Sequence, residues 1–267
     1  VGEKDSDPVF YINDLLPHLS KEQITKPLAT AIDGETLNVL VGGYPFKDDD
    51  VKEKVKLTVL KKLNETYGMK ETDFISAELC VVPAYKARDI GFDRALIGGY
   101  GHDDRVCSYP AMTALGESKD ELSTVVVVLA DKEEIGSEGA TGMQCGIFSD
   151  LVDMLAASQG VPASVVRANS KCLSADVTAG FDPNFAGVFE KRNSSIVSCG
   201  TALCKFTGAG GKSGSSDASA ELVGYVRRIF EKANVNWQMA ELGKVDAGGG
   251  GTVAKYIAKL NIDTIDI

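Results

Sequence analysis

The sequence predicts an α/β fold in which a mixed β-sheet is flanked by helices. From about residue 90 onwards, strand-like apolar runs alternate with helical patterns, as is typical of this class. Residues 125–128 are consecutive valines, and an unbroken apolar run indicates a strand covered on both faces. A chain of 267 residues can bury one large core or two smaller ones, and we predict two units, residues 1–88 and 89–267.

The first unit is predicted to contain one clear amphipathic helix. Lysines take one face, Gly68 supplies the stop, and the apolar face repeats at every fourth residue, with Val51, Val55, Val59 and Leu63. We also predict a helix over residues 12–19 and strands over residues 37–43 and 75–82, the second ended by Pro83.

The second unit is predicted to alternate strands and helices after the valine strand at residues 123–130. A helix is expected at residues 147–157 and short strands at 195–199, 203–206 and 262–267. A further helix is predicted after Ser216 as its cap, with an apolar stripe of Leu222, Val226, Ile229 and Ala233.

Composition excludes several classes of partner. The formal net charge of −10 and a pI of about 4.8 exclude nucleic acid and anionic membranes as main partners, because both require clustered Lys and Arg. No apolar run approaches the ~18 residues of a membrane span, so we expect a soluble protein. Six scattered cysteines without CxxC pairs predict reduced, mostly buried thiols in the cytoplasm.

Acidic residues gather directly after the valine strand, in the segment DKEEIGSEGATG. In open α/β sheets, ligands bind at the carboxyl ends of the strands. Glu133 and Glu134 would repel each other there, which indicates a nearby cation or a raised pKa. A solvated acidic loop is the alternative interpretation.

Two further acidic motifs are GHDDRVC, with Asp103 and Asp104, and SADVTAGFDPNF, with Asp176 and Asp182. A paired-metal site needs one bridging carboxylate, others that anchor each ion, and a free carboxylate as base. Three acidic loops can supply these groups.

Histidine ligands are scarce, since the chain has only His18 and His102. His18 lies on a predicted helix of the first unit and is expected to be structural. His102 precedes Asp103 and is a candidate for supporting a metal ligand.

Five motifs resemble, in order, the aspartyl aminopeptidase and aminopeptidase I family of zinc metallopeptidases. They are GEKDSDPVF with DLLPHL, ARDIGFDRALIGGYGHDDRVC, DKEEIGSEGATG, SADVTAGFDPNF and WQMAELGKVDAGGGGTVA. The resemblance implies a zinc-peptidase-like catalytic domain over residues 89–267 and part of an inserted oligomerisation domain over residues 1–88. It also implies a homo-oligomer built from dimers, up to a dodecamer, that removes residues from the amino ends of peptides.

The resemblance implies a role for each carboxylate. Asp103 bridges two divalent ions, Glu134 binds one and Asp176 binds the other, with Zn expected and Co or Mn as alternatives. Glu133 is the general base that takes a proton from the attacking water and passes it to the leaving amine.

The family pattern also includes an upstream and a downstream histidine that have no counterpart in this chain. Val1 is expected to lie inside the inserted domain and Ile267 just before the downstream histidine. The chain by itself is therefore expected to bind metal weakly and to be nearly inactive.

Substrate preference is predicted from Lys205, which resembles a substrate-binding lysine of members that prefer amino-terminal Asp or Glu. A surface lysine on an edge strand is the alternative. The resemblance also implies that Gly250, Gly251 and Thr252 bring backbone amides to the substrate, whereas a flexible glycine loop is the alternative.

Other motifs and functions are less well supported. GAGGKSGSS has Phe206 where a phosphate loop requires glycine, and GGYGHDD lacks the third glycine of a dinucleotide fingerprint. Cys107, Cys145 and Cys199 have no His at a recognisable spacing, so core packing is favoured over nucleophilic catalysis. A non-catalytic assembly module is one rival, although it has no need of four clustered carboxylates. A carboxylate-only Mg or Mn phosphoesterase is another.

Overall fold

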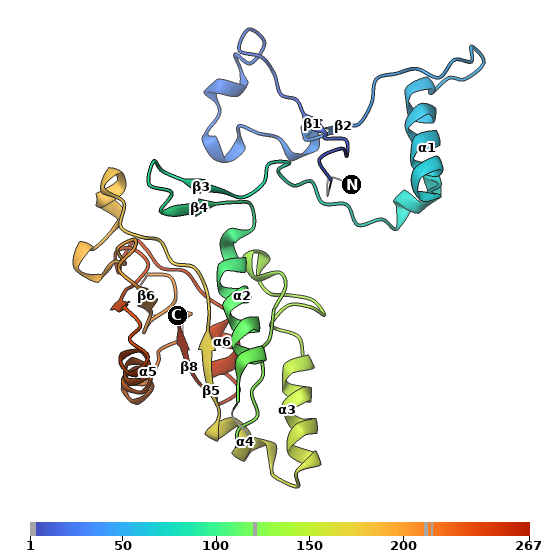
Figure 1. Cartoon of the computed structure of the whole chain (residues 1–267). Coiled ribbons are helices and arrows are strands. Elements are labelled where there is room, and N and C mark those ends of the chain that lie inside the picture. The colour runs from blue at the N-terminus through green and yellow to red at the C-terminus, as the bar shows by residue number, and fades with distance from the viewer. Residues whose placement is uncertain (1–3, 120–121, 211–212, 215) are drawn as a thin grey trace. The chain divides into compact units, whose positions relative to one another are not determined.

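The computed structural model describes residues 4–119, 122–210, 213–214 and 216–267 (Figure 1). The chain divides into two compact units, Val1–Tyr100 and Gly101–Ile267. Helices occur with both parallel and antiparallel strand pairs, which confirms the predicted mixed α/β fold class.

The helices are α1 (Lys54–Tyr67), α2 (His102–Glu117), α3 (Ile147–Ser158), α4 (Ala163–Asn169), α5 (Ala220–Lys232) and α6 (Ala254–Ala258). The strands are β1 (Tyr11–Ile12), β2 (Val39–Leu40), β3 (Arg88–Ile90), β4 (Leu96–Gly98), β5 (Lys171–Ser174), β6 (Thr201–Leu203), β7 (Trp237–Met239) and β8 (Asp263–Asp266).

The first unit contains α1 and two small antiparallel sheets, β1–β2 and β3–β4. The predicted amphipathic helix is confirmed as α1, although it begins at Lys54 and leaves Val51 outside. It ends at Gly68, which adopts a left-handed φ of 71° while its N–H donates to the Asn64 carbonyl at 2.8 Å. Glycine suits this position because it has no Cβ to clash there.

Two predictions for the first unit are wrong. Residues 12–19 form no helix. Pro17 lacks an N–H donor, and Leu19 remains 66% exposed, so the described structure provides little burial to stabilise a helix here. Residues 76–82 pair with no strand of the described chain, and a 3-10 turn at Glu71–Ile75 precedes them. Of residues 37–43, only β2 is paired.

The second unit is built around two parallel strand pairs, β5–β8 and β6–β7. A bridge between Cys204 and Asp266 links β8 to the chain that leaves β6. Helix α5 covers this junction, and their shared core consists of side chains at most 2% exposed: Leu203, Ala218, Leu222, Val226 and Ile265. This core fixes where β6 and β8 end, and the candidate site lies at those ends.

Helix α5 buries Leu222 and Val226 of the predicted apolar stripe, whereas Ile229 is 44% exposed and Ala233 is the exposed C-cap. The predicted N-cap is wrong. Ser219 is the N-cap, because its Oγ accepts the N–H of Leu222 at 3.1 Å. Ser216 is buried before the helix, where its N–H donates to Thr207 Oγ1 at 3.3 Å. The sequence offers several serines here, and only packing selects among them.

The predicted central valine strand is wrong for this chain. Residues 123–130 pair with no named strand of the described part, and Val125, Val126 and Val128 are 45%, 41% and 46% exposed. An apolar run needs neighbours on both sides to become a buried strand. The segment leads directly into the acidic loop, where Asp131 forms an isolated bridge with Gly142.

Of the other predicted elements, α3 and β8 are confirmed. The strand predicted at residues 195–199 is wrong, because only Ser195 makes an isolated bridge, to Gly180. Strand β6 starts and ends earlier than the predicted 203–206, at Thr201–Leu203.

The six cysteines are free, but the prediction that most are buried is wrong. Cys80 and Cys199 are exposed and the other four are half-buried. Within the described residues, no helix has the length and apolar character required to cross a membrane.

Candidate metal centre and adjoining cavity

Three aspartates from two chain segments form the candidate metal centre. Asp103 and Asp104 lie in the first turn of α2, where both have non-helical backbone angles and the peptide bond between them is cis. Asp176 follows β5, and its N–H donates to the Ile267 carbonyl beside the end of β8 at 3.1 Å. Carboxylate oxygens from all three lie within 4.8 Å of one another.

The three aspartates place several carboxylate groups close together in partly buried surroundings. Burial raises the pKa of Asp176 to about 6, and the neighbouring charges of Glu133, Asp104 and Asp103 add to this increase. Burial also raises the pKa of Asp104, and Asp104 Oδ1 has no hydrogen-bond partner among the described residues. Buried polar atoms normally have a partner, so the cluster fits a divalent cation as the group that would satisfy it.

The donor set also agrees with the chemistry of such ions. Carboxylate oxygens bind hard divalent cations, and zinc accepts Asp and Glu oxygens as well. Cys107 lies beside Asp104, but burial raises the pKa of its thiol to about 12. In the described residues, the group of mutually close ligand atoms consists of the three aspartates and does not include the Cys107 sulfur, so the aspartates are the ligands that this centre offers.

The acidic loop holds Glu133 and Glu134 in a 3-10 turn, Glu133–Ile135. The turn is closed by the Ser137 N–H, which donates to the Lys132 carbonyl at 2.7 Å. The loop's other carboxylates serve as local acceptors. Thr141 Oγ1 donates to Asp131 at 3.0 Å and Gln144 Nε2 donates to Glu138 at 2.9 Å.

Glu133 lies close enough to the three aspartates for their charges to affect it. Burial is the first cause that raises the pKa of its carboxyl, followed by the charges of Glu134, Asp103 and Asp104, whereas Lys255 lowers it. A half-buried carboxyl with a raised pKa beside a cation site suits a general base. Glu134 is exposed and does not join the cluster of aspartates within the described chain.

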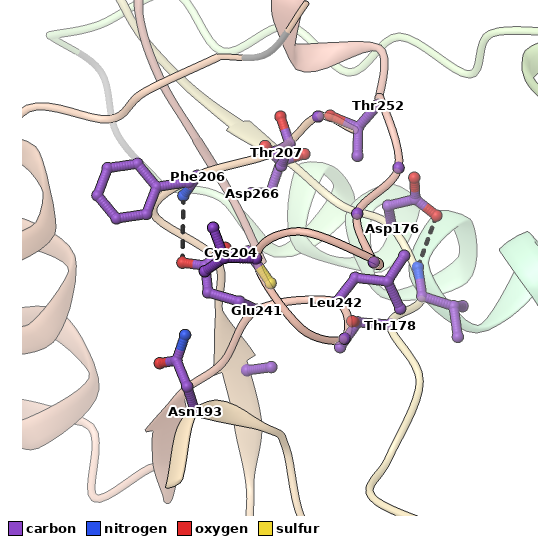
Figure 2. Close-up of a pocket in the computed structure, with 18 of the residues that line it drawn as sticks. Asp176, Thr178, Asn193, Cys204, Phe206, Thr207, Glu241, Leu242, Thr252 and Asp266 are labelled. Carbon is purple, nitrogen blue, oxygen red and sulfur yellow. Dashed lines mark hydrogen bonds between the residues drawn. The ribbon is translucent and has the colours of Figure 1, made fainter. Parts of the chain in front are cut away.

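A cavity of about 260 Å³ adjoins the cluster and shares Asp176 with it (Figure 2). Most of its lining comes from β6 and from the chain after β5, β6 and β7, with the end of β8 and Asn193 completing it. The apolar part of the wall includes Val177, Leu242 and Val245. The polar part includes Asp176, Glu241, Asp266, Lys244 and Thr252.

The structure brings two of the four predicted substrate residues to this cavity. Gly250 and Thr252 line it, whereas Gly251 and Lys205 are absent from the lining formed by described residues. The glycine segment is held by the Gly208 N–H, which donates to the Gly250 carbonyl at 2.8 Å. Gly249 has a φ of 98° and packs so closely on Gly208 that a Cβ would clash, which accounts for glycine here.

Lys205 is engaged elsewhere. Its Nζ lies 2.6 Å from Asp217 Oδ1 and donates to the Ala218 carbonyl at 2.5 Å. The ammonium is also 4.6 Å from the centroid of the Phe206 ring. These contacts tie Lys205 to the segment that leads into α5.

Sequence reasoning assigned no role to Asp104, Glu241 or Asp266. Asp104 directly follows Asp103 in the GHDD motif, and this position is the sequence feature that could have identified it as a second metal ligand. Glu241 follows β7, which pairs with β6, and Asp266 ends β8, which is bridged to Cys204 just after β6. A linear pattern does not reveal that these segments meet. Neither histidine joins the cluster of aspartates in the described residues.

Comparisons with known proteins agree with this geometry. A model of the family described as aminopeptidase I zinc metalloprotease (M18) matches residues 2–267. The "Probable M18 family aminopeptidase 1" of Clostridium acetobutylicum is 48% identical over 270 residues, covering 100% of this chain and 58% of the relative.

Solved structures give the same result. The crystal structure of an M18 family aminopeptidase from Thermotoga maritima is 43% identical, with a TM-score of 0.92, covering 100% of this chain and 59% of that one. Aminopeptidase I from C. acetobutylicum is 50% identical, with a TM-score of 0.90 and coverages of 100% and 58%. This chain thus spans 58–59% of the length of these proteins, and it belongs to the aminopeptidase I zinc metalloprotease (M18) family.

Proposed function

We propose that the protein carrying this chain is a metalloaminopeptidase, which hydrolyses the first peptide bond of peptide substrates. The observation that carries the proposal is the position of Glu133 beside the Asp103–Asp104–Asp176 cluster. The cluster in turn shares Asp176 with the cavity, so a substrate residue in the cavity would place its carbonyl next to these groups.

Two divalent ions, with Zn favoured over Co and Mn, would be held by these carboxylates. Asp103 would bridge them, Asp176 would anchor one, and Glu134 would anchor the other from the neighbouring loop. The unpartnered Oδ1 makes Asp104 a further candidate ligand. When bound, the ions would polarise the scissile carbonyl and favour ionisation of the attacking water.

Glu133 would move the proton. Its carboxylate would accept a proton from the water that attacks the carbonyl and would deliver it to the nitrogen of the leaving amine. Burial, followed by the neighbouring carboxylate charges, raises the pKa of the Glu133 carboxyl in the metal-free protein, so this carboxylate accepts a proton more readily than an exposed glutamate.

Preference for an amino-terminal Asp or Glu is the finer prediction that Lys205 supports. A substrate carboxylate would have to draw the Lys205 ammonium away from Asp217, its partner at 2.6 Å. Lys205→Met tests this directly. A selective loss of activity on aspartyl substrates supports the preference, and an equal change for leucyl substrates contradicts it.

The decisive experiment measures release of the chromophore from aminoacyl p-nitroanilides by the intact, zinc-loaded protein. Glu133→Gln is expected to lower kcat by about 10²–10⁴-fold while metal content stays constant. Glu138→Gln is the matched control, because Glu138 bonds Gln144 within the same loop. Cleavage of amino-terminally acetylated substrates, or hydrolysis of phosphoesters instead of peptides, would contradict the proposal.

We also propose that the intact protein is a homo-oligomer in the cytoplasm and that the first unit makes the contact between subunits. Large apolar side chains of that unit remain exposed, including Leu28 at 92%, Ile24 at 74% and Val9 at 71%. Apolar side chains with this degree of exposure would be covered if the unit packs against another subunit. Light scattering of the intact protein at several concentrations tests this, and a monomer at every concentration would contradict it.

A further inference from the structure

A second pocket, of about 620 Å³, is formed by α6 and by the chain that follows the acidic loop. Its lining consists of Gln144, Gly214, Lys255, Tyr256, Ala258 and Lys259. Two of these described residues carry an ammonium group and none carries a carboxylate. The pocket therefore suits an anionic group.

The two lysines are positioned by one aromatic ring. The Nζ atom of Lys255 lies 4.9 Å from the centroid of the Tyr256 ring, and that of Lys259 lies 5.8 Å from it. Tyr256 packs against the buried cluster that includes Met143 and Ile257, so the core fixes the position of the ring. Cation–π contacts favour these ammonium positions and leave both charges available to a ligand.

Neither ammonium forms an ion pair within the part of the chain that the structure describes. The nearby carboxylates of the acidic loop do not neutralise them directly. Glu138 accepts a hydrogen bond from Gln144 Nε2 at 2.9 Å. Burial raises the pKa of the Glu133 carboxyl and the Lys255 charge lowers it, so the two groups interact without a salt bridge. Two lysines in this state can bind a ligand carboxylate by charge-assisted hydrogen bonds.

The pocket and the cavity beside the metal centre share one chain segment. Gly250 and Thr252 line the cavity, and Lys255, three residues further along, lines the pocket. The Lys255 Nζ atom lies 3.5 Å from the position that a Cβ on Gly251 would occupy, and its charge acts on Glu133. A peptide with its first residue in the cavity and its first peptide bond beside Glu133 would therefore lead its following residues towards Lys255.

We propose that this pocket binds the carboxyl-terminal carboxylate of short peptide substrates through Lys255 and Lys259. The inference rests on the proposed aminopeptidase function and adds a subsite for the departing part of the substrate. It leaves the preference for the first residue unchanged. An extended chain advances about 3.3–3.6 Å per residue, so only peptides of suitable length bring their terminal carboxylate to two fixed ammonium groups. Short peptides with a free carboxyl end would then be favoured over those with a blocked one.

The test compares kcat/KM of the intact, zinc-loaded protein on Leu-Ala, Leu-Ala-Ala and Leu-Ala-Ala-Ala, each as the free acid and as the carboxyl-terminal amide. At one or more of these lengths the free acid is expected to be favoured about three- to tenfold. Lys255→Met and Lys259→Met should each bring this acid-to-amide ratio close to unity. Lys232→Met, in the last turn of α5 and outside the described pocket lining, is the matched control and should keep the ratio.

The ratio is the readout because Lys255 also acts on Glu133, and a change in the general base alters the rates for acid and amide alike. A side-chain carboxylate on the first residue is the other source of the same anionic group. The amides of Asp-Ala-Ala and Leu-Ala-Ala distinguish the two sources. A fall in the aspartyl-to-leucyl ratio in Lys255→Met would assign the pocket to the first residue and overturn the proposal. Equal kcat/KM for acid and amide at every length would also overturn it.

Binding of Leu-Ala-Ala and its amide, measured by calorimetry on the zinc-loaded protein carrying Glu133→Gln, separates this inference from the proposed function. If the unmodified protein hydrolyses no peptide, but the acid binds more tightly and adding Lys255→Met removes the difference, the proposed function fails and the carboxylate site stands. If peptides are hydrolysed and neither lysine variant changes the acid-to-amide ratio, the proposed function stands and the carboxylate site is overturned. Equal or absent binding of acid and amide, together with no hydrolysis, overturns both.

Discussion

The Lys205 ammonium lies 2.6 Å from the Asp217 carboxylate, and this pair connects the chain after β6 to the segment that enters α5. The side chains are 28% and 46% exposed, so solvent moderates their attraction. The pair therefore acts mainly by keeping the lysine away from other anions.

Asp217→Asn is expected to release Lys205 for interaction with an acidic substrate side chain. Activity on aspartyl p-nitroanilide should rise several-fold relative to leucyl p-nitroanilide, because the ammonium then lacks its nearest counter-charge. Asp217→Asn combined with Lys205→Met should cancel the gain. A gain that persists in the double variant would show that Lys205 is not its source.

Asp176→Asn is expected to weaken metal binding, because it removes a charged oxygen from a cluster of three carboxylates. Zinc content after dialysis against a weak chelator measures this effect. Asp182→Asn is the control within the same motif, since the Asp182 carboxylate accepts the Asn184 N–H at 2.8 Å and caps a turn. Equal zinc retention by both variants would contradict the assignment of Asp176 as a ligand.

Glu241 should make the stability of the metal-free protein depend on pH. Burial raises the pKa of its carboxyl from 4.5 to about 7, so the folded state holds the proton more tightly than the unfolded state. Its contribution to stability is full below about pH 4.5 and is lost as the pH rises through about 7.

Glu241→Gln should therefore raise the free energy of unfolding at pH 8 by roughly 2–3 kcal/mol and change it little at pH 4.5. Urea unfolding at both pH values measures the difference. The same gain at pH 4.5 and pH 8 would show that packing rather than ionisation is responsible.

Ser219 makes two side-chain hydrogen bonds at the start of α5. Its Oγ accepts the Leu222 N–H at 3.1 Å and donates to Asp263 Oδ2 at 2.9 Å, which ties the helix to β8. Ser219→Ala is expected to cost about 1–2 kcal/mol of unfolding free energy. Ser219→Thr keeps the hydroxyl and should retain most of it, and equal losses in both variants would rule out the hydroxyl as the cause.

Leu222 and Ile229 give a matched pair for testing the core. Leu222 is 1% exposed against β6 and β8, whereas Ile229 on the same helix is 44% exposed. Leu222→Ala is expected to cost about 2–5 kcal/mol and Ile229→Ala less than about 1 kcal/mol, as measured by denaturant unfolding. Similar costs would contradict the placement of the core.

Sequence pattern was sufficient where the signal is local. The spacing of Val55, Val59 and Leu63 with Gly68 specified α1 and its end, because side-chain periodicity and the left-handed glycine both act within a few residues. Pattern failed for the valine run, since consecutive valines reveal a preference for burial but not which strands will cover them.

For the candidate site, the sequence by itself determined which chemistry was available: acidic residues in three loops, with Glu133, Asp103 and Asp176 among them. Only the tertiary structure decided which of them meet. Parallel pairing of β5 with β8 brings Asp176 to the end of β8, beside Asp266, and the same folding commits Lys205 to Asp217 and leaves Glu241 facing the cavity. The physical reason is that each residue type fixes its own chemistry. Which charges lie close together, how deeply they are buried and which partners they have depend on segments that are distant in sequence and meet only when the chain packs.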